Sequence, residues 1–158
     1  GYWYRQLLAE SIGKATTTKD TPFANALLPI VSTAADLHSM AQLYLSGYEH
    51  TYTRFVFAPF DRSPRIDTHP IIESVPFLAK RTMNDVRSAI KDGVVRAYDE
   101  KRLPYQYTEI PKIDAYEIGY LLASLMSETM ILAGLLEVNA FDQPNVELYK
   151  KHTRTALT

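Results

Sequence analysis

Apolar and polar residues follow one another along the chain in blocks that predict helices separated by short strands. Apolar faces at helical spacing, bounded by capping or stop residues, predict five helices, over residues 2–12, 34–47, 82–103, 114–138 and 143–154. Short runs that are apolar, aromatic or β-branched predict three strands, over residues 27–32, 52–59 and 105–111. The segment 60–76 contains three prolines and predicts an irregular connection.

Local capping signals set the expected starts of three of these helices. Residues 32–33 are Ser-Thr and precede the second helix. Thr82 has Asp85 three positions later, which is a weaker form of the capping box. Asp114 has Glu117 three positions later and is placed to cap the longest helix.

The alternation of strands with helices predicts the α/β class, with a mostly parallel sheet flanked by helices. Three strands make a thin sheet for five helices. We therefore expect either that a partner covers one edge of the sheet or that strands are missing upstream. The helix at 114–138 is apolar almost all round, and it contains Glu117 and Glu128. Two central carboxylates are costly in a bilayer, so we expect a buried helix, inside a large protein or between subunits.

Composition narrows the class of protein. The chain has 158 residues, 46% hydrophobic and 22% charged, which suits a packed domain or a large part of one. A formal net charge of -1 argues against a nucleic-acid or anionic-membrane partner. The absence of cysteine excludes disulfides and thiolate chemistry and suits the cytoplasm. The first residues read as helix without a cap or a signal peptide, so we expect a trimmed domain or a fragment of a larger one.

The dipeptide Gly13-Lys14, followed by Thr16–Thr18, raises the question of a phosphate-binding loop. Such a loop needs glycine where Leu8 stands and serine or threonine where Ala15 stands. It also follows a strand, whereas the residues before Gly13 are typical of a helix. These three differences exclude a nucleotide-binding loop.

Two further residues carry chemistry that their surroundings do not explain fully. Glu10 lies in the last turn of the first helix, where the helix dipole slightly disfavours a carboxylate, so it is either a solvated side chain or a functional one. His38 lies in the first turn of the second helix, where a surface or core histidine with satisfied hydrogen bonds is the default. The other histidines are His50, His69 and His152, and no two histidines have metal-ligand spacing, so we expect no metal site.

Gln143 and Lys150 are separated by seven positions, which is two helical turns. They are therefore expected on one helix face, where an amide and a cation would suit a polyoxygenated ligand. Alternatively, Asp142 caps the last helix and Lys150 is simply solvated. Composition leaves both interpretations open.

Three motifs, in family order, give the chain a specific resemblance. Residues 9–14 (AESIGK) contain Glu-Ser-x-Gly-Lys, and residues 33–47 (TAADLHSMAQLYLSG) contain Asp-Leu-His-Ser-x-x-Gln-x-x-x-x-Gly. Residues 140–150 (AFDQPNVELYK) follow a Gly-apolar-apolar lead and match Phe-Asp-Gln-x-Gly-Val-Glu-x-x-Lys except at one position. Together with residues 108–122, these segments resemble the C-terminal part of glucose-6-phosphate isomerase.

The resemblance implies a sugar-isomerase (SIS-like) fold and a reversible conversion of glucose 6-phosphate to fructose 6-phosphate through an enediol. It implies a cytoplasmic homodimer that acts on a sugar phosphate without a cofactor, a nucleic acid or a membrane. By position, Glu10 matches the catalytic base. His38 matches the ring-opening histidine, which in the family reaches the neighbouring subunit's site, and Lys150 matches the lysine at the ring and O1 end. Gln6 and Gln143 match glutamines that contact the substrate.

The chain departs from the family pattern in two ways. Asn145 stands where the signature usually has glycine, and asparagine is the next-best residue for a left-handed turn. The family's Gly-Gly-Arg-[Phe/Tyr]-Ser motif and its phosphate-holding Ser/Thr loop do not occur in residues 1–158. We therefore expect the C-terminal part of an isomerase, inactive or nearly so by itself. The alternative is a non-catalytic sugar-phosphate-binding or dimerisation module on the same scaffold, and the joint presence of the candidate residues favours the enzyme.

Overall fold

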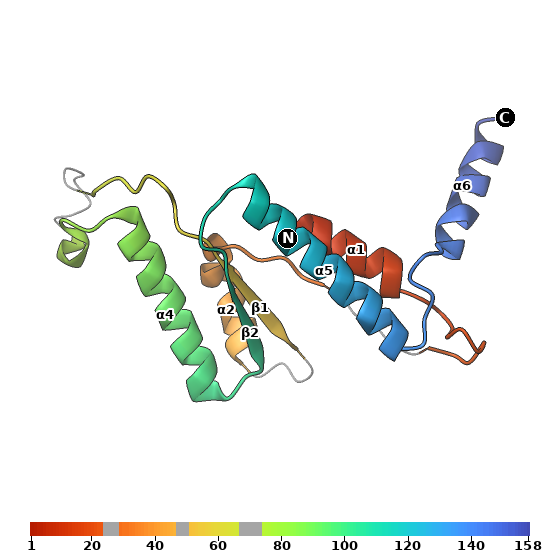
Figure 1. Ribbon diagram of the computed structural model, residues 1–158, viewed down its shortest axis with the longest axis horizontal. Coiled ribbons are helices and arrows are strands. Elements are labelled where there is room, and N and C mark those ends of the chain that lie inside the picture. The colour runs from red at the N-terminus through yellow and green to blue at the C-terminus, as the bar shows by residue number, and fades with distance from the viewer. Residues whose placement is uncertain (24–28, 47–50, 67–73) are drawn as a thin grey trace. The chain divides into compact units, whose positions relative to one another are not determined.

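A computed structural model describes residues 1–23, 29–46, 51–66 and 74–158. The chain divides into two compact units, which are described separately (Figure 1). The first unit contains residues 1–31 and 120–158, and the second contains residues 32–119. Three positions used in the sequence analysis, Gly47, His50 and His69, lie outside the described residues.

The second unit is built on a β-α-β arrangement. Strand β1 (Thr53–Phe57) pairs in parallel with β2 (Tyr105–Glu109), and helix α4 (Met83–Lys101) lies between them in sequence. A parallel pair needs a crossover of this length because the chain must return to the same end of the sheet. The α/β class and the parallel pairing are therefore confirmed. Both strands match predicted segments, with slightly shorter bounds.

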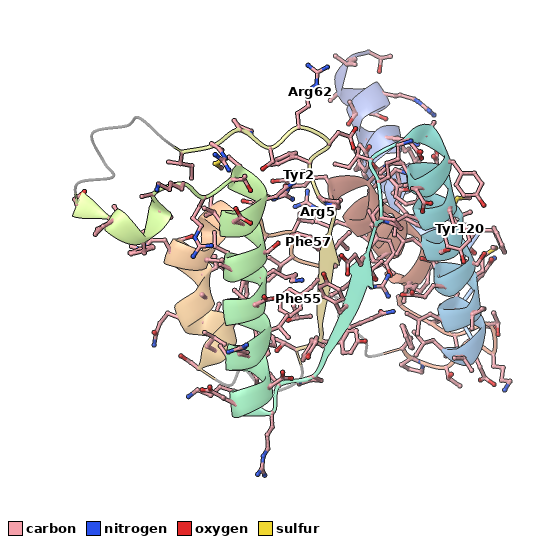
Figure 2. All side chains as sticks on the ribbon, turned by 60° about the vertical axis from the view of Figure 1, so that its left-hand side comes forward. Tyr2, Arg5, Phe55, Phe57, Arg62 and Tyr120 are labelled. Carbon is pink, nitrogen blue, oxygen red and sulfur yellow. The ribbon has the colours of Figure 1, made fainter. Side chains whose placement is uncertain are left out.

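An aromatic cluster joins α4 to the two strands. The Tyr98 ring of α4 is 5% exposed and meets Phe55 of β1 edge-on, with 5.0 Å between ring centroids. The Tyr105 ring of β2 lies 6.1 Å from Tyr98 in the same T-shaped geometry, which aromatic quadrupoles favour. Figure 2 shows Phe55 and Phe57 together on the side of β1 that faces α4. Alternate positions of β1 thus pack their half-buried rings against the crossover helix.

Capping boxes start the helices of this unit as predicted. The Thr82 hydroxyl accepts from the Asp85 amide, and the Thr82 amide donates to Asp85 Oδ2 at 2.7 Å. At the second helix, the Thr33 amide donates to Asp36 Oδ2 at 2.6 Å. A 3₁₀ turn there leads into α2 (Leu37–Leu45), which packs against α4. These starts depend on residues only three positions apart, and the sequence therefore specifies them directly.

The first unit is helical in the part that the structure describes. Helix α1 (Tyr2–Ile12) lies beside α5 (Ala115–Leu135), most of which belongs to this unit (Figure 1). Tyr4 Oη donates to Glu128 Oε1 at 2.8 Å and ties the two helices together. Helix α6 (Pro144–Ala156) follows near the C-terminus, where the sequence predicted it.

Helix α5 is only partly covered in the part of the chain that the structure describes. One stripe at helical spacing is buried, formed by Leu125, Thr129 and Ala133. The remaining faces carry exposed large apolar side chains, such as Ile131 at 64% and Tyr120 at 67%. Figure 2 shows Tyr120 on α5. Within the described residues only this stripe is covered, so burial of the other faces inside a larger protein or between subunits stays a prediction. By length and apolar composition α5 would also suffice to cross a membrane, which for a single helix is weak evidence of a span.

The predicted strand over residues 27–32 is wrong for 29–32, which have no regular structure, while 27–28 lie outside the described residues. Pro29 has no amide hydrogen to donate to a ladder, and a strand also needs a neighbour to pair with. The described sheet has only the two strands β1 and β2.

Candidate functional site

The end of α1 presents Glu10 to solvent. Its carboxylate accepts a hydrogen bond from Gln6 Nε2, with 2.9 Å between Nε2 and Oε1. The two residues are one helical turn apart, so their side chains lie on the same face of α1. The structure therefore brings the predicted base into contact with one predicted substrate-binding residue.

Gly13 ends α1 in a tight turn. Its φ of -71° and ψ of 69° fit an inverse γ-turn, and the Lys14 amide donates to the carbonyl of Ile12 at 2.7 Å. A Cβ at Gly13 would collide with the carbonyl oxygen of Ala9. Glycine is therefore needed here for close approach of backbone to backbone. The turn brings the side chain of Lys14 back over the last turn of the helix.

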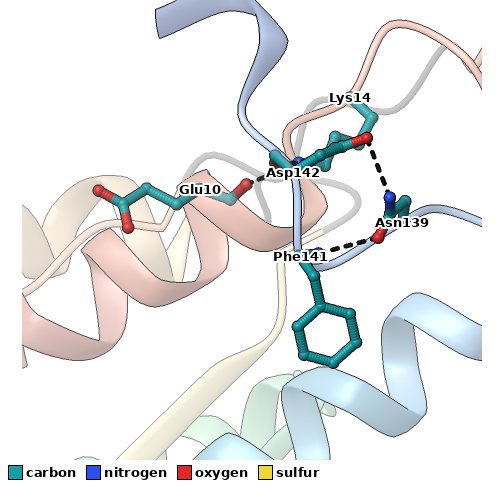
Figure 3. A network of polar contacts seen from close by, with 5 residues as sticks. All are labelled: Glu10, Lys14, Asn139, Phe141 and Asp142. Atoms are coloured by element: carbon teal, nitrogen blue, oxygen red, sulfur yellow. Dashed lines mark hydrogen bonds and ion pairs between the residues drawn. The ribbon is translucent and has the colours of Figure 1, made fainter.

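Lys14 joins the end of α1 to the loop before α6. Its ammonium donates to the carbonyl oxygen of Glu10 at 3.0 Å and to that of Asp142, and it forms an ion pair with Asp142 Oδ1 at 3.0 Å. The Lys14 side chain is only 7% exposed. Figure 3 shows the Glu10 carboxylate pointing away from Lys14 while the backbone carbonyl of Glu10 points toward it. The carboxylate thus stays free of the lysine.

Asp142 is braced from its other side by Asn139. The amide of Asn139 donates to Asp142 Oδ2 at 3.0 Å, and its Oδ1 accepts from the Phe141 amide at 3.0 Å (Figure 3). The interpretation of Asp142 as a helix cap is wrong, because Gln143 occupies the cap position of α6 and no side chain caps it. The Asp142 carboxylate forms an ion pair with Lys14 instead. Sequence reasoning missed this contact since the partners are 128 positions apart.

Gln143 and Lys150 lie at the start and in the middle of α6. Gln143 is exposed, and its carbonyl accepts from the Val146 amide at 3.2 Å. Lys150 Nζ donates to Glu147 Oε1 at 2.9 Å, which raises the pKa of Lys150 and keeps it a cation. In the described part of the chain, neither residue has a hydrogen bond to Glu10.

His38 lies on the exposed surface of the first turn of α2, in the second unit. Glu10, Gln6, Gln143 and Lys150 all belong to the first unit. Across residues 1–23, 29–46, 51–66 and 74–158, no group of three or more histidine, aspartate or glutamate side chains is placed to hold a metal ion.

This arrangement suits proton transfer on a small polar ligand. The Glu10 carboxylate lies at the end of α1, and one of its oxygens accepts a hydrogen bond from the Gln6 amide. Lys14 connects this helix end to the loop that leads into Gln143. A general base must reach a substrate carbon while its own backbone stays in place. Exposed amide and ammonium groups on α6 add donors for hydroxyl or phosphate oxygens.

Comparison with known proteins confirms the predicted resemblance. No family model matches the chain. It is 32% identical to the glucose-6-phosphate isomerase of Shouchella clausii (strain KSM-K16), over 95% of this chain and 32% of the relative. It is 31% identical to that of Carboxydothermus hydrogenoformans, over 98% of this chain and 34% of the relative. The chain thus spans about one third of the length of these curated relatives.

A solved structure gives a similar result. The crystal structure of a hypothetical protein from Thermus thermophilus superposes with a TM-score of 0.87 at 28% sequence identity. The match covers 99% of this chain and 38% of the other. The chain therefore shares the fold of a segment from a larger protein.

Proposed function

We propose that this chain is the C-terminal part of a glucose-6-phosphate isomerase and supplies that enzyme's catalytic base. The relatives carry this name, and the motifs that contain Glu10, His38, Gln143 and Lys150 occur in family order. The observation that carries the proposal is the exposed Glu10 carboxylate, held by Gln6 at the end of α1. A positioned, accessible carboxylate is what enediol chemistry requires of a base.

In the proposed reaction the sugar ring first opens, which moves a proton from O1 to the ring oxygen. Lys150 and His38 act at this step. The Glu10 carboxylate then removes the proton from C2, the electron pair of the C2–H bond forms the C1–C2 double bond of the enediol, and the carbonyl oxygen at C1 takes up a proton from solvent to become a hydroxyl. The π electrons of the double bond then take the proton from Glu10 onto C1, the electron pair of the O2–H bond forms the C2 carbonyl of the ketose, and the O2 proton returns to solvent. Gln6 and Gln143 bind substrate oxygens, and no cofactor takes part.

We also propose a substrate, an oligomeric state and a cellular compartment for the full-length enzyme. The partner is a sugar phosphate, and the full-length protein works as a homodimer in the cytoplasm. In this dimer His38 serves the neighbouring subunit's site. The names of the relatives support the sugar phosphate as the partner. The near-neutral charge of the chain suits neither a nucleic acid nor an anionic membrane. The homodimer, the cytoplasm and the role of His38 rest on the resemblance of the motifs.

The decisive test replaces Glu10 by glutamine in the full-length polypeptide. Glutamine keeps the size of the side chain and can still bond to Gln6, but it does not accept a proton at neutral pH. We expect kcat to fall by about 10²–10⁴-fold, the usual contribution of a general base, while the dissociation constant for fructose 6-phosphate changes little. A coupled assay and calorimetric binding measure the two quantities.

Glu100→Gln is the matched control, because Glu100 is an exposed glutamate in the last turn of α4. It should retain wild-type activity. Activity that persists in Glu10→Gln would refute the assignment of the base. A wild-type polypeptide that binds the sugar phosphate without turnover would instead indicate the non-catalytic module.

A further inference from the structure

We propose that Lys14 is a positioning residue that fixes the backbone of Glu10 relative to the loop that carries Gln143. The inference rests on the proposed function for its consequence in catalysis. Its structural part stands on the contacts of Lys14 alone. Lys14 lies immediately after the turn at Gly13, and the sequence by itself assigned it no chemistry.

Three oxygens surround the ammonium of Lys14. It donates hydrogen bonds to the carbonyl oxygens of Glu10 and Asp142. It also forms an ion pair with Oδ1 of Asp142. With 7% of the side chain exposed, little of this cation is left for a substrate. Since a buried charge needs partners, these three oxygens explain how the Lys14 ammonium is accommodated between the two backbone segments.

The carbonyl of Glu10 needs a partner because α1 ends abruptly. In a continuing helix the Lys14 amide would bond to this carbonyl, but the turn directs that amide to Ile12. The carbonyl of Glu10 is therefore one of the orphan acceptors of a helix C-terminus. The Lys14 ammonium satisfies it, and a cation at this end also complements the helix dipole.

Both bridged carbonyls belong to backbone positions that control the site. One is the backbone of Glu10 itself, and the other is that of Asp142, the residue directly before Gln143. Asn139 holds the second carboxylate oxygen of Asp142, so within this loop the Asp142 side chain has a partner on each of its two oxygens. Replacement of Lys14 would remove the contacts that hold the backbone of Glu10 and the backbone of Asp142 at the same time. A misplacement of about 1 Å at a catalytic group can cost about 10²-fold in rate.

The test compares Lys14→Met with Lys14→Arg in the full-length polypeptide. Methionine keeps the apolar stem and removes the charge, and arginine restores the donors. We expect Lys14→Met to lower kcat by about 10–100-fold, with a much smaller change in KM, because positioning acts mainly in the transition state. Lys14→Arg should recover part of the loss.

Lys19→Met is the matched control. Lys19 forms a 2.6 Å ion pair with Glu137 in the same unit, but both side chains are more than half exposed. This variant should keep wild-type kcat. Thermal unfolding curves of all variants show how much of each protein is folded at the assay temperature. A lower kcat in a fully folded variant is then not due to loss of folded protein.

Hydrogen–deuterium exchange supplies a readout that does not need activity. Amides of residues 139–143 and of the last turn of α1 should exchange faster in Lys14→Met than in the wild type, and the Lys19→Met variant should not show this change. Unchanged exchange would overturn the positioning role whatever the enzyme does. Faster exchange with unchanged kcat would mean that Lys14 stabilises the local structure without affecting catalysis, and this result would also overturn the proposal. A wild type without isomerase activity would refute the proposed function instead.

Discussion

At the scale of single residues, Asp85 links the start of α4 to pH. Its carboxylate accepts from the amide of Thr82 at 2.7 Å and from the hydroxyl at 2.8 Å. These hydrogen bonds, with smaller contributions from Arg81 and Arg65, lower the pKa of Asp85 from its usual value of 3.8. Hydrogen bonds to the charged form favour that form.

The sign of the pH effect follows from this direction. Because the folded pKa of Asp85 lies below 3.8, its contribution to stability is complete above pH 3.8 and is lost as the pH falls through the folded value. We therefore expect Asp85→Asn to destabilise the protein at pH 7, and the difference from wild type to shrink below pH 3.8. Urea unfolding at a series of pH values measures it. A difference independent of pH would contradict the prediction.

Residues three positions apart could be read from the sequence, and residues far apart could not. The caps at Thr82 and Asp114 were predicted correctly, and the Glu117 amide does donate to Asp114 Oδ1, at 2.9 Å. The contact of Lys14 with Asp142 depends on how two distant segments fold together. No local pattern encodes such a contact, so the sequence left Lys14 without a role and offered the cap as one of two open interpretations of Asp142.

At the scale of elements, α5 has two kinds of surface. Ala133 is 2% exposed and lies on the buried stripe with Thr129, which is also 2% exposed. Ala123 lies on the exposed surface of the same helix. The two alanines lie on the same helix and differ in burial. The same substitution at both positions therefore shows how much packing of the buried stripe contributes to stability.

Ala133→Leu should therefore destabilise the protein by about 1–3 kcal/mol, since a filled site has no room for three more carbons. Ala123→Leu should change stability by less than about 0.5 kcal/mol, as surface substitutions usually do. Urea unfolding followed by circular dichroism measures both. Equal effects at the two positions would show that the buried stripe is not a packed contact.

The elements also show where pattern reading fails. Strands β1 and β2 carry alternate aromatic residues that pack on α4, and this combination made them predictable. The run at 27–32 is equally apolar, but apolarity does not supply a strand with a neighbour. Likewise, the composition of α5 indicates a helix that prefers burial, whereas what covers it depends on the rest of the structure.

At the scale of the whole molecule, the chain exposes more large apolar side chains than a helical surface needs. Phe141 and Leu157 are each 83% exposed, and Leu135 on α5 is 76% exposed. The curated relatives are about three times as long as this chain, of which they match nearly all. Both observations lead to the expectation that the proposed chemistry depends on chain beyond these residues.

The phosphate group of the proposed substrate needs a binding site of its own. The 158 residues contain no Gly-Gly-Arg sequence, and the family's phosphate-holding Ser/Thr loop does not occur among them either. Binding of a remote phosphate holds the reacting carbons against the base, and its loss lowers the rate of the chemical step as well as the affinity. We therefore expect the purified 158-residue chain to show kcat/KM at least about 100-fold below that of the full-length polypeptide. A coupled assay on both proteins measures the ratio.

The result can be separated from simple misfolding. Circular dichroism and size-exclusion chromatography establish that the chain is folded at the assay concentration, and Glu10→Gln in the chain fixes the background rate. Turnover close to the full-length value that is lost in Glu10→Gln would mean that residues 1–158 hold a complete site. The cation that binds the phosphate would then have to be among these 158 residues.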